Sequence, residues 1–200
     1  TNFVKNLSKF KQVTLEINNQ SELNKELLEF LTKQKFQIRL YANSHEEIDR
    51  FKYQLIASEV RIDKSLKTIH PNSFDGFNYL SNVLFDLPSS INTIGYHAFC
   101  GCSSLTQITI PYSVIQIGSF VFENCCSLEQ ILFEDPSSIT QIGEGAFINC
   151  SQLEKISIPS SVAQIGDGAF YNCSSLTKIS IPSSVIHIGE GAFSECSSLN

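Results

Sequence analysis

The 200-residue sequence contains no methionine and no tryptophan, and only 17% of its residues are charged. It has no apolar run near the roughly 18 residues that a membrane-spanning helix needs, so we expect no membrane insertion by this chain. Hydrophobic residues still make up 42% of the chain, which excludes disorder and predicts a sizeable core. The missing initiator methionine is typical of a piece of a longer product, so the lack of a leader or anchor is uninformative.

Positive charge is scarce in the larger part of the chain. Residues 69–200 contain Lys155 and Lys178 and no arginine, against 11 acidic residues, whereas residues 1–68 hold 12 of the 14 Lys and Arg. Phosphate binding requires clustered cations, so we expect no nucleic acid as a partner of residues 69–200. The asymmetry also predicts two regions of different construction.

The motifs of common catalytic and cofactor sites are missing as well. The sequence has no Gly-rich phosphate loop, no Gly-x-Ser-x-Gly, no His-Glu-x-x-His and no EF-hand loop. Its histidines, His45, His70, His97 and His187, fall on unrelated positions. We therefore expect no catalytic residue, no metal and no cofactor.

What the sequence does have is a repeat of 23–25 residues. Its glycine column is Gly95, Gly118, Gly143, Gly166 and Gly189. Other columns keep the same spacing, and they are expected to form the structural core: Phe99, Phe122, Phe147, Phe170 and Phe193, with Cys102, Cys125, Cys150, Cys173 and Cys196. One such unit cannot bury its own apolar face, so the units are predicted to stack as a solenoid.

Each unit contains a strand followed by a turn. The string Leu-x-x-Ile-x-Ile alternates with period 2, which predicts a short strand with one buried face. A proline then ends the strand, because it lacks the N–H that a ladder needs. The following Val-x-x-Ile-Gly-x-x-Ala-Phe returns the chain, and its Ala-Phe is predicted to form about one helical turn.

These motifs resemble the leucine-rich repeat superfamily, and more closely its BspA-like (Treponema-type) class, over residues 85–199 closely and 60–84 loosely. The resemblance implies an α/β fold: a right-handed solenoid with one parallel β-sheet on the concave face and short helical turns or loops on the convex face. It also implies an interaction or adhesion protein displayed at the cell surface. An intracellular, cytoplasmic scaffold or adaptor is the alternative.

The first third keeps the spacing but not the consensus. Strand positions recur from Leu15 and Ile38 onward, which predicts eight parallel strands in one sheet. Apolar stripes at Leu23–Leu31 and Ile48–Leu55 predict helices between the early strands. We therefore expect residues 1–59 to form a helix-bearing cap and residues 60–200 to form BspA-like repeats, with an independent α/β domain as the alternative for the first part.

The cysteine column favours buried thiols over disulfides or zinc. Stacked coils place its side chains about 5 Å apart and parallel, whereas a disulfide needs converging Cβ atoms about 3.5–4.5 Å apart. A straight row also cannot form a tetrahedral zinc site. Beside it, Asn124, Asn149 and Asn172 are expected to bridge adjacent coils through their amides.

A column of acids lies just before Ala-Phe. A stack of these carboxylates would suit calcium. A simpler explanation is that each acid lies at the start of a helical turn, where free N–H groups favour negative charge. The column is Glu144, Asp167 and Glu190.

The outward residues of the strands are the candidate partner-binding surface, for a protein or glycoprotein ligand. Alternation predicts this set as Gln107, Thr109, Gln130, Leu132, Lys155, Ser157, Lys178 and Ser180. A merely solvated surface is the competing interpretation. The last residues, Leu199 and Asn200, open another strand motif, which predicts an apolar end capable of end-to-end self-association.

Overall fold

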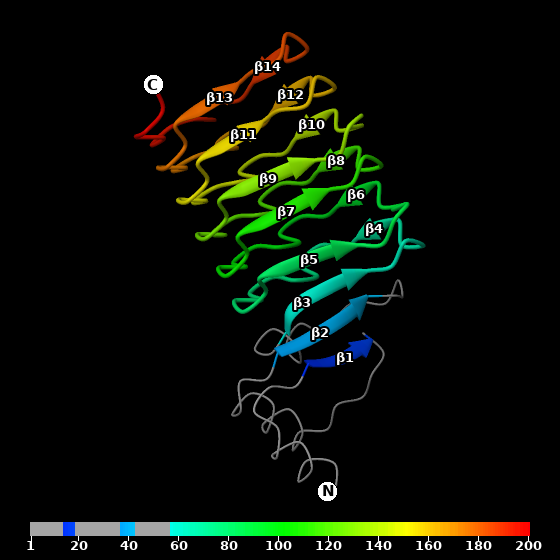
Figure 1. Ribbon diagram of the computed structural model, residues 1–200. Coiled ribbons are helices and arrows are strands. Elements are labelled where there is room, and N and C mark those ends of the chain that lie inside the picture. The colour runs from blue at the N-terminus through cyan, green and yellow to red at the C-terminus, as the bar shows by residue number, and fades with distance from the viewer. Residues whose placement is uncertain (1–13, 19–36, 43–56) are drawn as a thin grey trace, which may run out of the picture.

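The computed structural model describes residues 14–18, 37–42 and 57–200. In these residues the chain forms a parallel β-solenoid of about six turns. Figure 1 shows the coils stacked from β1 at the bottom to β14 at the top, each on the one before it. Every strand pairing among these residues is parallel, as stacking of similar coils requires.

One long strand lies at each of the eight predicted positions. Proline follows β7, β11 and β13 within two residues, as predicted, and follows β5 and β9 three residues later. The long strands are β1 (Thr14–Asn18), β2 (Gln37–Ala42), β3 (Ala57–Ile62), β5 (Asn82–Phe85), β7 (Gln107–Ile110), β9 (Gln130–Phe133), β11 (Lys155–Ser157) and β13 (Lys178–Ser180).

The long strands form two sheets, so the prediction of a single sheet is wrong. One sheet has the order β1-β2-β3-β5 and the other β7-β9-β11-β13. β5 and β7 lie side by side, but no hydrogen-bonded ladder joins them in the described structure (Figure 1). Alternation in a sequence specifies which side chains face inward, and it contains no information on whether neighbouring backbones come close enough to pair.

A second row of strands lies across the core from the first. These strands have two residues each and form a continuous six-stranded parallel sheet, where the sequence predicted turns or loops. The isoleucine of each is buried except in the last strand, where Ile188 is 46% exposed. The strands are β4 (Thr68–Ile69), β6 (Thr93–Ile94), β8 (Gln116–Ile117), β10 (Gln141–Ile142), β12 (Gln164–Ile165) and β14 (His187–Ile188).

The Ala-Phe segments are turns, so the predicted helical turns are wrong, and the described residues contain no helix. In one coil, Gly145 and Asn149 lie two residues either side of Phe147 with φ of 55° and 59°. Left-handed residues at both positions prevent a right-handed helix from forming. The N–H of Phe147 instead donates to the carbonyl of Ala169 in the next coil, at 2.8 Å.

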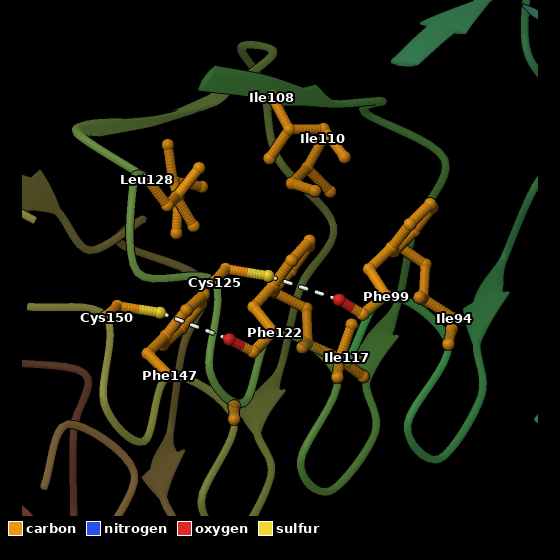
Figure 2. Close-up of a cluster of buried hydrophobic side chains, with 14 of the residues drawn as sticks. Ile94, Phe99, Ile108, Ile110, Ile117, Phe122, Cys125, Leu128, Phe147 and Cys150 are labelled. Carbon is orange, nitrogen blue, oxygen red and sulfur yellow. Dashed lines mark hydrogen bonds between the residues drawn. The ribbon is translucent and has the colours of Figure 1, made fainter. Parts of the chain in front are cut away.

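The core consists of columns that run along the stack. Six phenylalanine rings, from Phe74 to Phe193, stack with neighbouring centroids 5.1–5.6 Å apart and planes within 18° of parallel. Figure 2 shows Phe99, Phe122 and Phe147 in this stack, with the isoleucines of both strand rows around them. The column phenylalanines are buried except Phe193, which is half-buried. Contacts between coils therefore supply most of the apolar burial.

The two helices predicted for the first third lie outside the described residues. At the backbone level, β1 pairs with β2 and β2 pairs with β3, so these early strands continue the ladder of the repeats. In the part of the chain that the structure describes, no helix has the length and apolar character needed to cross a bilayer.

Candidate functional site

The strand face consists of the outward side chains of β7, β9, β11 and β13. The inward residues Ile108, Ile131 and Ile156 are buried, so their neighbours along each strand point away from the core. These neighbours are exposed, apart from the half-buried Gln130. The strand face comprises Gln107, Thr109, Gln130, Leu132, Lys155, Ser157, Lys178 and Ser180.

The register of the strands arranges this face in two rows. Gln107, Gln130, Lys155 and Lys178 lie opposite one another on successive strands and make the first row. The two lysines therefore stand about 4.8 Å apart at the backbone, one interstrand spacing. In the second row, Thr109 lies opposite Leu132, and Ser157 lies opposite Ser180.

Two shallow clefts lie on the strand face. The first runs between β5 and β7, where the ladder is interrupted, and Gln107 and Thr109 line it. The second lies over β9 and β11 and is lined by Gln130, Leu132, Lys155 and Ser157, among others. Six of the eight predicted residues therefore line one of the two clefts.

Sequence reasoning missed two acidic residues at these clefts. Glu134 lines both clefts, and Asp135 lines the second. The Glu134 carboxylate accepts a hydrogen bond from the backbone N–H of Tyr112 at 3.0 Å. The signal was a two-residue insertion before Pro136, which lengthens the loop after β9 and brings both acids to the face.

The column cysteines are buried and lie behind the strand face. Each thiol donates to the carbonyl of a column phenylalanine in the preceding coil, at 3.1–3.2 Å. Figure 2 shows two of these bonds, from Cys125 to Phe99 and from Cys150 to Phe122. Burial raises the pKa of Cys150 well above its usual range and that of Cys173 to about 12. The thiols thus satisfy backbone acceptors between coils.

Thiol labelling of the native protein is expected to be much faster at exposed Cys126 than at the column cysteines. Cys126 is exposed, whereas Cys150 is fully buried and has a raised pKa, so N-ethylmaleimide should modify Cys150 at least about a hundredfold more slowly. Peptide mass spectrometry after timed quenching measures both rates in one sample. In denaturant the two rates should converge, and a disulfide between any two column cysteines would contradict the assignment.

The asparagine column confirms the predicted amide bridges. Asn149 donates to Asn124 at 2.8 Å, and Asn172 donates to Asn149 at 2.9 Å. All three have positive φ, which asparagine tolerates better than most residues.

The acid column has a different setting from the one predicted. Glu144, Asp167 and Glu190 are exposed and lie in turns rather than at the start of helical turns. The Asp167 carboxylate accepts a hydrogen bond from the backbone N–H of Glu190 at 2.9 Å. At this position the acid therefore ties its coil to the next one.

A further group of side chains was not foreseen. His97, Cys100 and Glu123 come together beside the phenylalanine stack, although the repeat positions of the histidines predict no such grouping. Burial, then the charges of Glu123 and Asp75, raises the pKa of Cys100 to about 12. The sequence signal for this group is that its residues depart from the repeat consensus, which becomes visible when the repeats are compared column by column.

Comparison with known proteins places the chain in a family. The model described as BspA type leucine rich repeat region matches six copies, over residues 46–135 and 68–200. The chain therefore belongs to the BspA-type leucine-rich repeat family. Repeat proteins of this kind are generally protein-interaction modules and generally non-enzymatic. No curated protein matches the chain.

Solved structures share the fold. A leucine-rich repeat protein of T. pallidum is 26% identical with a TM-score of 0.69, over 96% of this chain and 79% of that one. One from Eubacterium ventriosum is 21% identical with a TM-score of 0.59, over 82% of this chain and 59% of that one. The pneumococcal vaccine antigen PcpA is 17% identical with a TM-score of 0.52, over 94% of this chain and 60% of that one. The chain thus spans about three fifths of the last two.

Proposed function

We propose that the strand face binds a protein or glycoprotein ligand and that the protein acts in recognition or adhesion at a cell surface. The observation that carries this proposal is the row Gln107, Gln130, Lys155 and Lys178, which presents hydrogen-bonding and cationic side chains beside two clefts. A rigid sheet holds these groups at fixed spacing, which lowers the ordering cost of binding. The general role of such repeats in protein interaction supports the proposal.

An intracellular scaffold that uses the same face is the second candidate. It is compatible with seven cysteines whose thiols are all free, since reducing compartments keep thiols unpaired. A signal peptide or a membrane anchor in the full-length sequence would favour the surface role, and a full-length sequence with neither would favour the scaffold.

Reversing charge on the lysine pair should weaken binding of the ligand. Lys155 and Lys178 are the only cations in residues 69–200, so they are the natural contacts for an acidic group. The double change Lys155→Glu and Lys178→Glu is expected to raise the Kd at least tenfold, about 1.4 kcal/mol, with the Tm nearly unchanged. Surface plasmon resonance against an identified ligand measures the Kd, and calorimetry measures the Tm.

A charge-matched control is available on the opposite row of strands. The test variant carries Lys155→Gln and Lys178→Gln on the strand face. The control variant carries Gln116→Glu and Gln164→Glu, which change the net charge by the same amount. The side chains of Gln116 on β8 and Gln164 on β12 are exposed. Only the lysine pair should weaken binding. Loss of binding from changes at Glu144, Asp167 and Glu190, with the lysine variants unaffected, would place the site on the turns instead.

The remaining architectural predictions are part of the same proposal. Residues 1–59 form a helix-bearing cap, residues 60–200 form the repeats, the solenoid is right-handed, and its strand face is concave. Right-handed crossovers are the rule where parallel strands follow one another.

A further inference from the structure

Three side chains of different chemistry converge at one point beside the turns. The Nε2 atom of His97 lies 3.2 Å from Oε2 of Glu123, and Sγ of Cys100 lies 4.0 Å from the same oxygen. The three ligand atoms all lie within 4.8 Å of one another. Zinc bonds of usual length in a tetrahedral arrangement separate ligand atoms by about 3.3–3.8 Å. The cluster is therefore close to the spacing that a bound ion requires.

The repeat column that holds Cys100 departs from the consensus at this place. Asp75, Cys100 and Glu123 each follow the column phenylalanine directly, so they occupy one column on three successive coils. In the next three coils this column holds Ile148, Tyr171 and Ser194, so the metal-binding types are confined to one place.

His97 occupies a backbone position that does not favour it. Its φ is 52°, and the equivalent residues of the last three coils are Gly145, Gly168 and Gly191, also with positive φ. A left-handed backbone conformation is less favourable for histidine than for glycine, as it also is for Phe120 at the equivalent position of the next coil.

The neighbouring rings orient the His97 imidazole. The ring stacks on Tyr96 with centroids 3.9 Å apart and meets the edge of Phe120 at 5.5 Å. This packing holds the ring while Nε2 lies beside Glu123. A fixed imidazole is the arrangement that a metal ligand needs.

We propose that His97, Cys100 and Glu123 bind a zinc ion, with water as the fourth ligand. Imidazole nitrogen, thiolate sulfur and carboxylate oxygen together suit zinc, whereas calcium and magnesium take oxygen ligands alone. The Cys100 thiol releases its proton to solvent when the ion binds. Because Cys100 and Glu123 come from adjacent coils, the ion cross-links these two coils.

Cobalt titration of the reduced 200-residue chain tests the proposal. Co²⁺ should give a thiolate-to-metal charge-transfer band at one equivalent, and Zn²⁺ should displace it. The band should disappear in Cys100→Ser and persist in Cys126→Ser, because Cys126 is an exposed thiol outside the cluster. Absence of the band, or its survival in Cys100→Ser, would overturn the proposal.

His97→Gly separates a metal ligand from a structural residue. Glycine suits the positive φ, so the metal-free Tm should stay the same or rise, while zinc affinity should fall at least tenfold. At the same zinc concentration, zinc should raise the Tm of the parent chain and of Cys126→Ser more than that of His97→Gly. A loss of affinity below tenfold in His97→Gly would show that the histidine is not a ligand.

Discussion

Replacing Phe122 with alanine is expected to lower the free energy of unfolding by about 3–5 kcal/mol, the usual cost of removing a large buried aromatic side chain. Phe122 is fully buried and stacks on Phe99 at 5.6 Å and on Phe147 at 5.5 Å. The change therefore creates a cavity between coils and removes two ring contacts. Urea unfolding followed by circular dichroism measures the loss, provided that the m value is unchanged.

The end of the same stack provides the control. Phe193 is half-buried and has one stacked neighbour, Phe170, at 5.3 Å. Its replacement by alanine should cost about half as much as Phe122→Ala, because fewer contacts and less burial are lost. Equal losses at the two positions, or a loss below about 1.5 kcal/mol for Phe122→Ala, would mean that the stack is not the main stabilising column.

Gly143→Ala is expected to destabilise the protein by about 3 kcal/mol, at the upper end of what overpacking costs. A Cβ at this position would lie 2.6 Å from both the carbonyl carbon and the oxygen of Gly118 in the preceding coil. Both are backbone atoms and cannot rotate away, so the two coils would have to separate. The glycine column therefore permits the close approach of neighbouring coils. Thermal unfolding followed by calorimetry measures the loss of stability in Gly143→Ala.

Gly168→Ala separates this steric effect from backbone conformation. Gly168 has φ of 55°, but a Cβ there would meet its nearest neighbours at an ordinary 3.8 Å. Its replacement should cost only the strain of a left-handed alanine, about 1–2 kcal/mol. If Gly168→Ala proved more damaging than Gly143→Ala, contact between coils would not be the reason for the glycine column.

The repeat predicts where the long strands lie, but it does not predict that they form two sheets. Spacing from Leu15 to Ile181 located every long strand, because alternation with period 2 is a direct consequence of strand geometry. The two-residue strands were missed because two residues cannot display a period. The helical turns were wrongly predicted because the Ala-Phe motif was interpreted without the left-handed backbone conformations of its neighbours Gly145 and Asn149.

Of the two candidate sites, the sequence repeat predicts one and not the other. The row from Gln107 to Lys178 follows from register, which stacked identical strands must keep. The group of His97, Cys100 and Glu123 does not follow from register alone, because His97 and Glu123 belong to different columns and meet only through the spacing of coils. Residues that depart from a consensus on adjacent coils are informative when they are compared as neighbours in space.

The interrupted ladder between β5 and β7 has a mechanical consequence. At that level the short strands remain joined, since β4 pairs with β6, while the long strands are not. A bending force at this level therefore meets a continuous strand ladder on one side of the stack and an interrupted ladder on the other. Among the described residues the six-stranded sheet is the unbroken connection, and the first cleft lies at the interruption.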